Sequence, residues 1–180
     1  AVQGSGTMGL CSIAAIRKFT KAETVIAAAK YPLQRSLAEE FGADIVVEPS
    51  ELKRAVRQVT GCRMIGNSLS GGSNVTIDAV GSASSIETSL EITRPRGRLV
   101  MLGMPGVTKV DLTPLWHREI EMVGSYTYGT ETLPDGSVTN SYALAFELVR
   151  EMRLDKLVTD LYPLDRYKQA IRHAAEAGSL

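Results

Sequence analysis

The segment Gly4-Ser5-Gly6-Thr7-Met8-Gly9 constrains the fold of this chain more than any other, because it places a GxGxxG pattern between an apolar strand-like stub and an amphipathic helix. In such a turn the first glycine permits a tight bend, the second lets the backbone approach a ligand without an intervening Cβ, and the third lets the helix pack close to the sheet. The unpaired N–H groups and the dipole at the helix N-terminus favour an anion. The context predicts a phosphate-binding turn that opens a βαβ unit, and a glycine-rich turn without a ligand is the alternative.

Apolar runs and helix signals alternate along the rest of the chain. We expect helices over 7–19, from Pro32 to residue 42, from a cap at Ser50 to Gly61, and after a capping box formed by Ser84 and Glu87. We expect strands over 24–29, 44–47, 74–80, 98–103 and 120–126. The segment 61–73 should form an irregular surface loop. With the stub before the glycine turn this makes six strands. Since parallel neighbours need long right-handed crossovers, the pattern predicts an α/β fold, a doubly wound six-stranded parallel Rossmann sheet.

The ends of the chain carry two further signals. Only Ala1, Val2 and Gln3 precede the glycine turn and no initiating Met is present, whereas a first strand of ordinary length needs about five residues. We therefore expect a fragment whose first strand is truncated and whose N-terminal part is missing from this sequence. Two helical patterns near the other end predict a short helical C-terminal extension, which gives a Rossmann domain over 1–127 and the extension over 128–180.

Composition excludes several classes of protein. Hydrophobic residues make up 44% of the 180 residues, charged ones 22%, and 20 basic side chains balance 20 acidic ones without a run of like charge. This is typical of a globular protein and favours neither a nucleic acid nor a membrane as partner. Cys11 and Cys62 are too few for a disulfide framework, which favours a cytoplasmic location.

Longer segments of the chain resemble a known family. They are GSGTMGL, LAEEFGAD, VTIDAVGSASSIETSLEITRPRGRLVMLGMPG, EMVGSYTYG and LVTDLYPLDRYKQAI, in the expected order and over nearly the whole chain. The sequence is similar to the cofactor-binding half of zinc-type medium-chain dehydrogenase/reductases, the group of alcohol, sorbitol and threonine dehydrogenases. The resemblance implies a parent oxidoreductase that transfers a hydride between NAD(P) and an alcohol or carbonyl substrate.

The resemblance also implies a set of cofactor-binding residues. The turn from Ser5 to Met8 would donate backbone N–H groups to the pyrophosphate, and the end of the second strand would meet the adenosine ribose. The remaining residues would line the crevice and hold the nicotinamide carboxamide; the implied set outside the turn is Ala29, Lys30, Asp78, Ala79, Val80, Leu102, Gly103, Met104, Ser125 and Thr127. These residues follow the carboxyl ends of strands, where open α/β sheets bind ligands. For Asp78 the alternative is a structural cap of the turn at Gly81.

No catalytic or metal-binding residue is assigned to this sequence. Catalysis in the family depends on zinc held by Cys, His and an acidic residue in a separate N-terminal domain, so zinc is expected only in the missing part. His117, His173, Cys11 and Cys62 show no ligand spacing. The substrate pocket is largely built by the missing half, so the substrate cannot be inferred from these residues.

The residues that end the second strand bear on the choice between NAD and NADP. Relatives that prefer NAD usually have an acidic residue there, which accepts hydrogen bonds from both ribose hydroxyls. This chain has Ala29, followed by Lys30 and, one helical turn on, Arg35. Loss of a carboxylate and gain of a cation favour the 2′-phosphate of NADP. The alternative is that Lys30 and Arg35 are ordinary solvated charges and that the enzyme binds NAD.

The segment Val107–Leu112 predicts an assembly. It is a short extended run before Pro114, and the resemblance implies that it pairs with its twin across a two-fold axis, so we expect a homodimer. Two other functions stay open from the residues alone. A nucleotide-sensing or structural Rossmann module without catalysis is one, and a methyltransferase, which the six-strand pattern and the tail disfavour, is the other.

Overall fold

The computed structural model describes residues 1–133 and 135–176, which divide into two compact units, Ala1–Tyr126 and the residues from Thr127 onward. The first unit contains one six-stranded sheet in the order β3-β2-β1-β6-β7-β8, with every neighbouring pair parallel. Its strands are β1 (Val2–Gln3), β2 (Ile26–Ala28), β3 (Ile45–Val47), β6 (Ser73–Asp78), β7 (Thr93–Met101) and β8 (Glu121–Gly124). The predicted doubly wound Rossmann sheet is confirmed.

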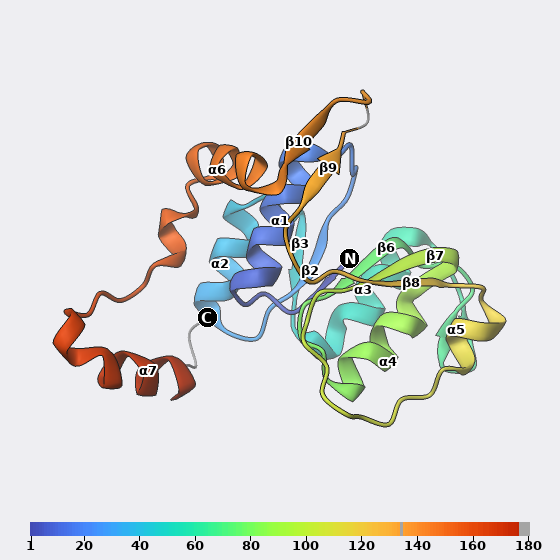
Figure 1. Cartoon of the computed structure of the whole chain (residues 1–180). Helices are drawn as coiled ribbons and strands as arrows, with labels where there is room; N and C mark the ends of the chain where they lie inside the picture. The colour runs from blue at the N-terminus through green and yellow to red at the C-terminus, as the bar shows by residue number, and fades with distance from the viewer. Residues whose placement is uncertain (134, 177–180) are drawn as a thin grey trace. The chain divides into compact units, whose positions relative to one another are not determined.

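Helices cover both faces of this sheet (Figure 1). Along the chain they are α1 (Thr7–Phe19), α2 (Pro32–Glu40), the 3₁₀ helix η1 (Pro49–Glu51), α3 (Leu52–Thr60), α4 (Ala83–Ile92) and α5 (Thr113–His117). Helices α1 and α2 lie on one face, and α3 and α4 lie on the other. The chain leaves β1 towards β2 and β3 and then returns to β6 on the other side of β1, which makes the boundary between β1 and β6 the topological switch point.

Burial follows the sequence pattern in the first helix. Leu10, Ile13 and Ala14 are fully buried, as their i, i+3, i+4 spacing predicts, and α1 has the predicted bounds. On the opposite face an apolar cluster joins α3 and α4 to the sheet through Leu52, Val56 and residues around them. Apolar side chains of the helices therefore pack against both faces of the sheet.

The segment 61–73, which we predicted to be an irregular loop, contains a short antiparallel hairpin of β4 (Met64–Ile65) and β5 (Ser68–Leu69). A buried side chain from elsewhere holds it: the Arg118 guanidinium donates hydrogen bonds to the carbonyl oxygens of Leu69, Gly71 and Thr93. Burial lowers the pKa of this guanidinium. The local prediction was wrong because the contact that orders the segment comes from a residue far along the chain.

Two predicted helix caps were also wrong. Helix α4 begins before Ser84, and its capping box joins Ser82 and Ser85 through Ser85 N to Ser82 Oγ (3.2 Å) and Ser82 N to Ser85 Oγ (3.0 Å). Serine here does the reciprocal capping expected of Glu87, since its hydroxyl both donates and accepts. Ser50 lies inside η1, and the N-cap residue of α3 is Glu51.

The second unit contains a hairpin and two helices. Strands β9 (Thr130–Thr132) and β10 (Val138–Asn140) pair antiparallel, and the Asn140 side chain accepts a hydrogen bond from Tyr142 N at the start of α6 (Ser141–Met152). The 3₁₀ helices η2 (Leu154–Leu157) and η3 (Leu164–Arg166) precede α7 (Tyr167–Glu176). The predicted helices are present, whereas the hairpin was not predicted. Among the described residues no helix combines the length and apolar character that crossing a membrane requires.

Candidate functional site

The strand register gathers the predicted site residues of the first unit along one edge of the sheet. Gln3 pairs with both Ala28 and Asp78, Asp78 pairs with Met101, and Met101 pairs with Gly124. The neighbouring strands β2, β1, β6, β7 and β8 therefore end at the same level. The residues that follow these strands therefore line the carboxyl edge: the turn 4–9, then 29–30, 79–80, 102–104 and 125. Thr127 is different, because it begins the second unit.

Each glycine of the turn has a separate spatial reason. Gly4 has a φ of +90°, and a Cβ there would lie 2.4 Å from Val80 Cγ2. A Cβ on Gly9 would lie 1.9 Å from the carbonyl oxygen of Gly4, so only glycine lets α1 pack against the turn. A Cβ on Gly6 would meet no atom within 4 Å. The fold requires Gly4 and Gly9, whereas Gly6 leaves open space beside its backbone, which is what a ligand needs to approach it.

The N-terminus of α1 is left without a side-chain cap within the described chain. Its N-cap is Gly6, which has no side chain, and the neighbouring Ser5 hydroxyl donates instead to the carbonyl oxygen of Ala28 at 2.9 Å. The first turn carries no acidic residue. Its N–H groups have no partner inside the helix, so this end of α1 can accept an anion.

Asp78 is fully buried at the end of β6, and both of its carboxylate oxygens accept hydrogen bonds. Oδ1 accepts from Val80 N at 2.8 Å and Gly81 N at 3.0 Å, and Oδ2 accepts from Ser85 Oγ at 2.9 Å. These contacts are those of a residue that shapes the turn and ties it to α4. Asp78 thus caps the turn at Gly81, which was the structural alternative for this residue.

The loops after β6 and β7 are in direct backbone contact. Leu102 N and Gly103 N both donate to the carbonyl oxygen of Asp78, at 2.9 and 2.7 Å. A Cβ on Gly103 would lie 2.4 Å from Gly81 N, so the two loops could not pack this closely with any other residue. The next strand follows the same pattern, since Ser125 N donates to Met101 O at 2.9 Å. Closely packed backbone groups therefore form this part of the edge.

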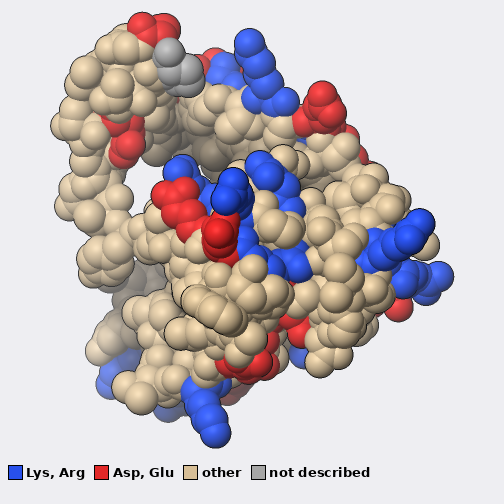
Figure 2. Space-filling model, turned by 90° about the vertical axis from the view of Figure 1, so that its right-hand side faces the viewer, with Lys and Arg blue, Asp and Glu red and all other residues tan. Residues whose placement is uncertain are grey.

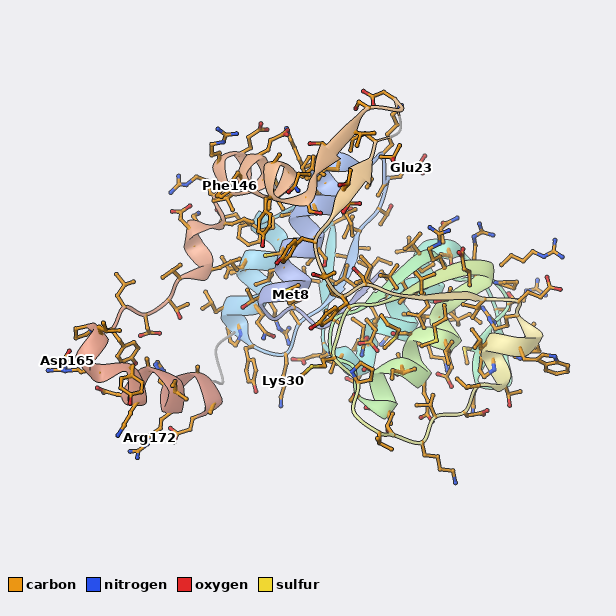
Figure 3. All side chains as sticks on the ribbon, in the orientation of Figure 1. Met8, Glu23, Lys30, Phe146, Asp165 and Arg172 are labelled. Atoms are coloured by element: carbon orange, nitrogen blue, oxygen red, sulfur yellow. The ribbon has the colours of Figure 1, made fainter. Side chains whose placement is uncertain are left out.

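Three apolar side chains along the edge are uncovered. Met8, Val80 and Met104 are all exposed, Met104 by 90%. Figure 3 shows Met8 near the start of α1 and Lys30 extending outward from the loop between β2 and α2. Uncovered apolar groups beside polar backbone suit a ligand that combines flat rings with phosphates.

The corner at the end of β2 holds contacts that the sequence did not predict. Ala29 is fully buried, and Lys30 is exposed with its ammonium 5.3 Å from the centre of the Tyr31 ring. Gln34, a residue we did not single out, accepts hydrogen bonds at Oε1 from Lys30 N (3.2 Å) and Tyr31 N (3.4 Å). Arg35 forms an ion pair with Glu48, which follows β3. A glutamine at the third residue of a helix was the available signal for Gln34.

A cavity of about 740 Å³ lies at the other end of the strands. Residues near the beginnings of β1, β2 and β6 line it, among them Ala1, Val25 and Ser73. Open α/β sheets bind ligands at the carboxyl ends of their strands, so we assign the candidate site to the carboxyl edge and not to this cavity.

The His and Cys side chains, to which no metal role was assigned, make separate contacts within the described residues. In residues 1–133 and 135–176 no group of three or more His, Cys, Asp or Glu side chains could hold a metal ion. His117 Nδ1 contacts the Thr113 carbonyl oxygen at 2.8 Å, and His173 Nδ1 contacts Tyr162 Oη at 2.6 Å. Cys11 lies in α1, where burial raises the pKa of its thiol. Zinc catalysis needs three protein ligands and an open coordination position, so the described residues do not fit a catalytic zinc.

Charges of both signs are mixed on one face of the molecule. On the face displayed in Figure 2, Lys and Arg side chains are interspersed with Asp and Glu side chains. A nucleic-acid-binding surface gathers basic side chains, and this face does not.

Comparison with known proteins identifies the family. The model of the family described as zinc-binding dehydrogenase matches residues 7–140. The chain belongs to this family. It is 26% identical over 179 residues to sorbitol dehydrogenase of Macaca fascicularis, and the match covers 94% of this chain and 44% of the relative. It is 30% identical over 131 residues to L-idonate 5-dehydrogenase (NAD(P)(+)) of Escherichia coli, and this match covers 72% of this chain and 35% of the relative. The chain therefore spans less than half the length of these curated relatives.

Solved structures share the fold of this zinc-binding dehydrogenase family member. L-idonate 5-dehydrogenase from Escherichia coli superposes with a TM-score of 0.75 at 24% identity, covering 99% of this chain and 46% of the other. A short chain alcohol dehydrogenase from Escherichia coli in complex with the cofactor NADH superposes with a TM-score of 0.74 at 18% identity, covering 99% and 48%. At these identities the likeness concerns the fold.

Proposed function

We propose that this chain is the cofactor-binding part of an oxidoreductase that transfers a hydride between a nicotinamide dinucleotide and an alcohol or carbonyl substrate. The open space beside the Gly6 backbone, at the uncapped N-terminus of α1, is the observation that carries the proposal. It lies at the switch point of the sheet, where dinucleotides bind in this type of fold. Family membership and the names of the relatives, which are dehydrogenases of polyols and related hydroxy compounds, support the reaction class.

In this proposal the dinucleotide lies along the carboxyl edge. The pyrophosphate accepts hydrogen bonds from N–H groups between Ser5 and Met8, and the adenosine ribose lies near Ala29 and Lys30. Residues 78–80 line the crevice beside it. The backbone groups of 102–104, together with Ser125 and Thr127, hold the nicotinamide carboxamide. The dinucleotide supplies the hydride, and the protein supplies binding and orientation.

NADP is the proposed cofactor, in preference to NAD. Ala29 brings no carboxylate to the ribose, and the next residue, Lys30, is exposed and carries an ammonium group. A charge-assisted contact with a 2′-phosphate corresponds to roughly tenfold tighter binding of NADPH than of NADH at low salt. Ala29→Asp would reverse this preference by adding a carboxylate that repels the phosphate and accepts from the ribose hydroxyls.

We further propose that the chain is the dinucleotide domain, 1–127, followed by an extension, 128–180, within a cytoplasmic homodimer whose catalytic zinc is held outside this sequence. The compact unit that ends at Tyr126 supports the boundary, and the scarcity of cysteine supports the compartment. Residues 107–112 form no strand in the single chain. Val107 and Leu112 in this segment are exposed, as is Trp116 in the helix that follows, which supports the segment as the dimer contact.

Calorimetric titration of the 180-residue chain with NADPH and with NADH tests the proposal. We expect both to bind at one site per chain, NADPH more tightly, and the difference to shrink as ionic strength rises. We expect no alcohol-dependent reduction of either oxidised cofactor, because the described residues hold no catalytic zinc. Absence of binding by both dinucleotides would contradict the proposed function, and equal binding would contradict the NADP preference alone.

A further inference from the structure

The corner at the ends of β2 and β3 brings three charged residues beside Ala29. The two strands pair in register through Ala28 and Val47, and Ala29 N donates to the Val47 carbonyl oxygen at 2.9 Å. Glu48, the next residue, therefore leaves the sheet beside Ala29. Lys30 follows Ala29 directly, and Arg35 lies in the first turns of α2. The proposed function assigns this corner to the adenosine ribose.

Glu48 and Arg35 neutralise each other at this corner. Their side chains form an ion pair in which Arg35 is 36% exposed and Glu48 is 47% exposed. Lys30 is exposed next to the Tyr31 ring. The corner thus has two cations, but one of them is already bound to a carboxylate. A 2′-phosphate arriving here meets a negative charge as well as two positive ones.

We propose that Glu48 is a specificity-determining residue, which competes with the 2′-phosphate of NADP for the Arg35 guanidinium and so limits the preference for NADPH. The inference rests on the proposed function, since it needs a dinucleotide at the carboxyl edge. Phosphate binding must displace Arg35 from Glu48 and place two anions near each other, whereas the uncharged ribose hydroxyls of NADH leave the pair intact. Removal of the Glu48 charge therefore acts on NADPH and not on NADH.

The expected effect is modest because the ion pair is exposed. Exposed pairs are partly screened by water and salt, and competition with one of them corresponds to roughly three- to fivefold in affinity. The same exposure makes Glu48→Gln a safe variant, because neither partner is left buried without a hydrogen bond. The fold of the variant is checked by its far-ultraviolet circular dichroism.

The experiment measures dissociation constants of NADPH and NADH for the 180-residue chain and three variants. Glu48→Gln should bind NADPH about three to five times more tightly with NADH unchanged, and the gain should vanish at high ionic strength. Adding Arg35→Gln to Glu48→Gln should remove the gain. The matched control is Glu121→Gln, which makes the same charge change in an exposed ion pair, with Arg98, at the amino end of β8. It should leave both constants unchanged.

Each other outcome overturns the inference in a recognisable way. If Glu48→Gln weakens NADH and leaves NADPH unchanged, Glu48 accepts from the ribose hydroxyls in place of the carboxylate missing at residue 29. If Glu121→Gln gives the same gain as Glu48→Gln, net charge and not this corner sets the preference. If neither dinucleotide binds to the unmodified chain, the proposed function fails together with this inference.

Discussion

Replacing Gly6 and Gly9 separately by alanine distinguishes a glycine that the ligand requires from one that the fold requires. At Gly6 the new Cβ would meet no atom within 4 Å, and the φ of −71° suits alanine. Alanine is a poorer N-cap than glycine by roughly 0.5–1 kcal/mol. It also lowers the conformational entropy of the unfolded chain, which stabilises the folded state by a similar amount. The two effects offset, so the stability of Gly6→Ala should stay within about 0.5 kcal/mol of the unmodified chain.

At Gly9 the new Cβ would lie 1.9 Å from the Gly4 carbonyl oxygen and 2.9 Å from its carbonyl carbon. Backbone atoms cannot move aside as the end of a flexible side chain can, so α1 must shift on the sheet. Overpacking of this kind costs about 1–3 kcal/mol or more. Gly9→Ala should therefore lose stability, whatever happens to binding.

The assay combines urea unfolding with dinucleotide titration. Gly6→Ala should unfold like the unmodified chain and yet bind dinucleotide at least about tenfold more weakly, since its Cβ occupies the space into which the pyrophosphate must come. Gly129→Ala is the control, because a Cβ there also meets nothing within 4 Å and the residue lies in the second unit. Normal binding by a well-folded Gly6→Ala chain would refute the assignment of this turn to a phosphate.

Three further outcomes are expected. Arg118→Met should destabilise the chain by about 2–4 kcal/mol in urea, because it leaves the buried carbonyl groups of Leu69 and Thr93 and the partly buried one of Gly71 without their donor. Arg98→Met should change stability by less than about 0.5 kcal/mol, and equal losses would contradict the buried role. In a Cys62→Ser chain, the pH at which alkylation of Cys11 reaches half its maximal rate should lie above the corresponding pH for a free cysteine. The reason is that burial raises the thiol pKa and lowers the thiolate fraction. A midpoint at or below that of free cysteine would contradict this. The single tryptophan, Trp116, is 80% exposed, so its emission should shift to shorter wavelength as concentration rises and the dimer forms; emission independent of concentration, with a monomeric mass by light scattering, would contradict the dimer.

The parts of the fold that the sequence predicted are those set by local pattern. Helix α1 begins and ends where predicted because Gly6 ends the turn and its apolar residues repeat with the period of a helix. The six parallel strands followed from apolar runs separated by crossovers of helical length. The β9–β10 hairpin could have been found as well, since the Pro134-Asp135-Gly136 sequence between two short runs of Thr and Val is a turn signal.

Features that depend on distant residues could not be predicted. The β4–β5 hairpin has strands of two residues and is held by Arg118. The sequence near residues 61–73 therefore does not include the residue that stabilises the hairpin. The ion pair of Arg35 with Glu48 forms because β2 and β3 pair in register, and register is not visible in sequence. For Asp78 the sequence allowed either a cofactor contact or a turn cap, and only the positions of Val80 N, Gly81 N and Ser85 Oγ revealed the three bonds it accepts.

Hydrogen exchange of the 180-residue chain with and without saturating NADPH tests the central claim most directly. The claim is that the carboxyl edge of the sheet holds the dinucleotide. It predicts slower exchange on binding in residues 5–9, 29–31, 78–80 and 102–104, and unchanged exchange in 20–25 and 73–75, which line the cavity at the amino ends of the strands. Protection confined to the cavity residues, or no protection in the glycine turn, would contradict it.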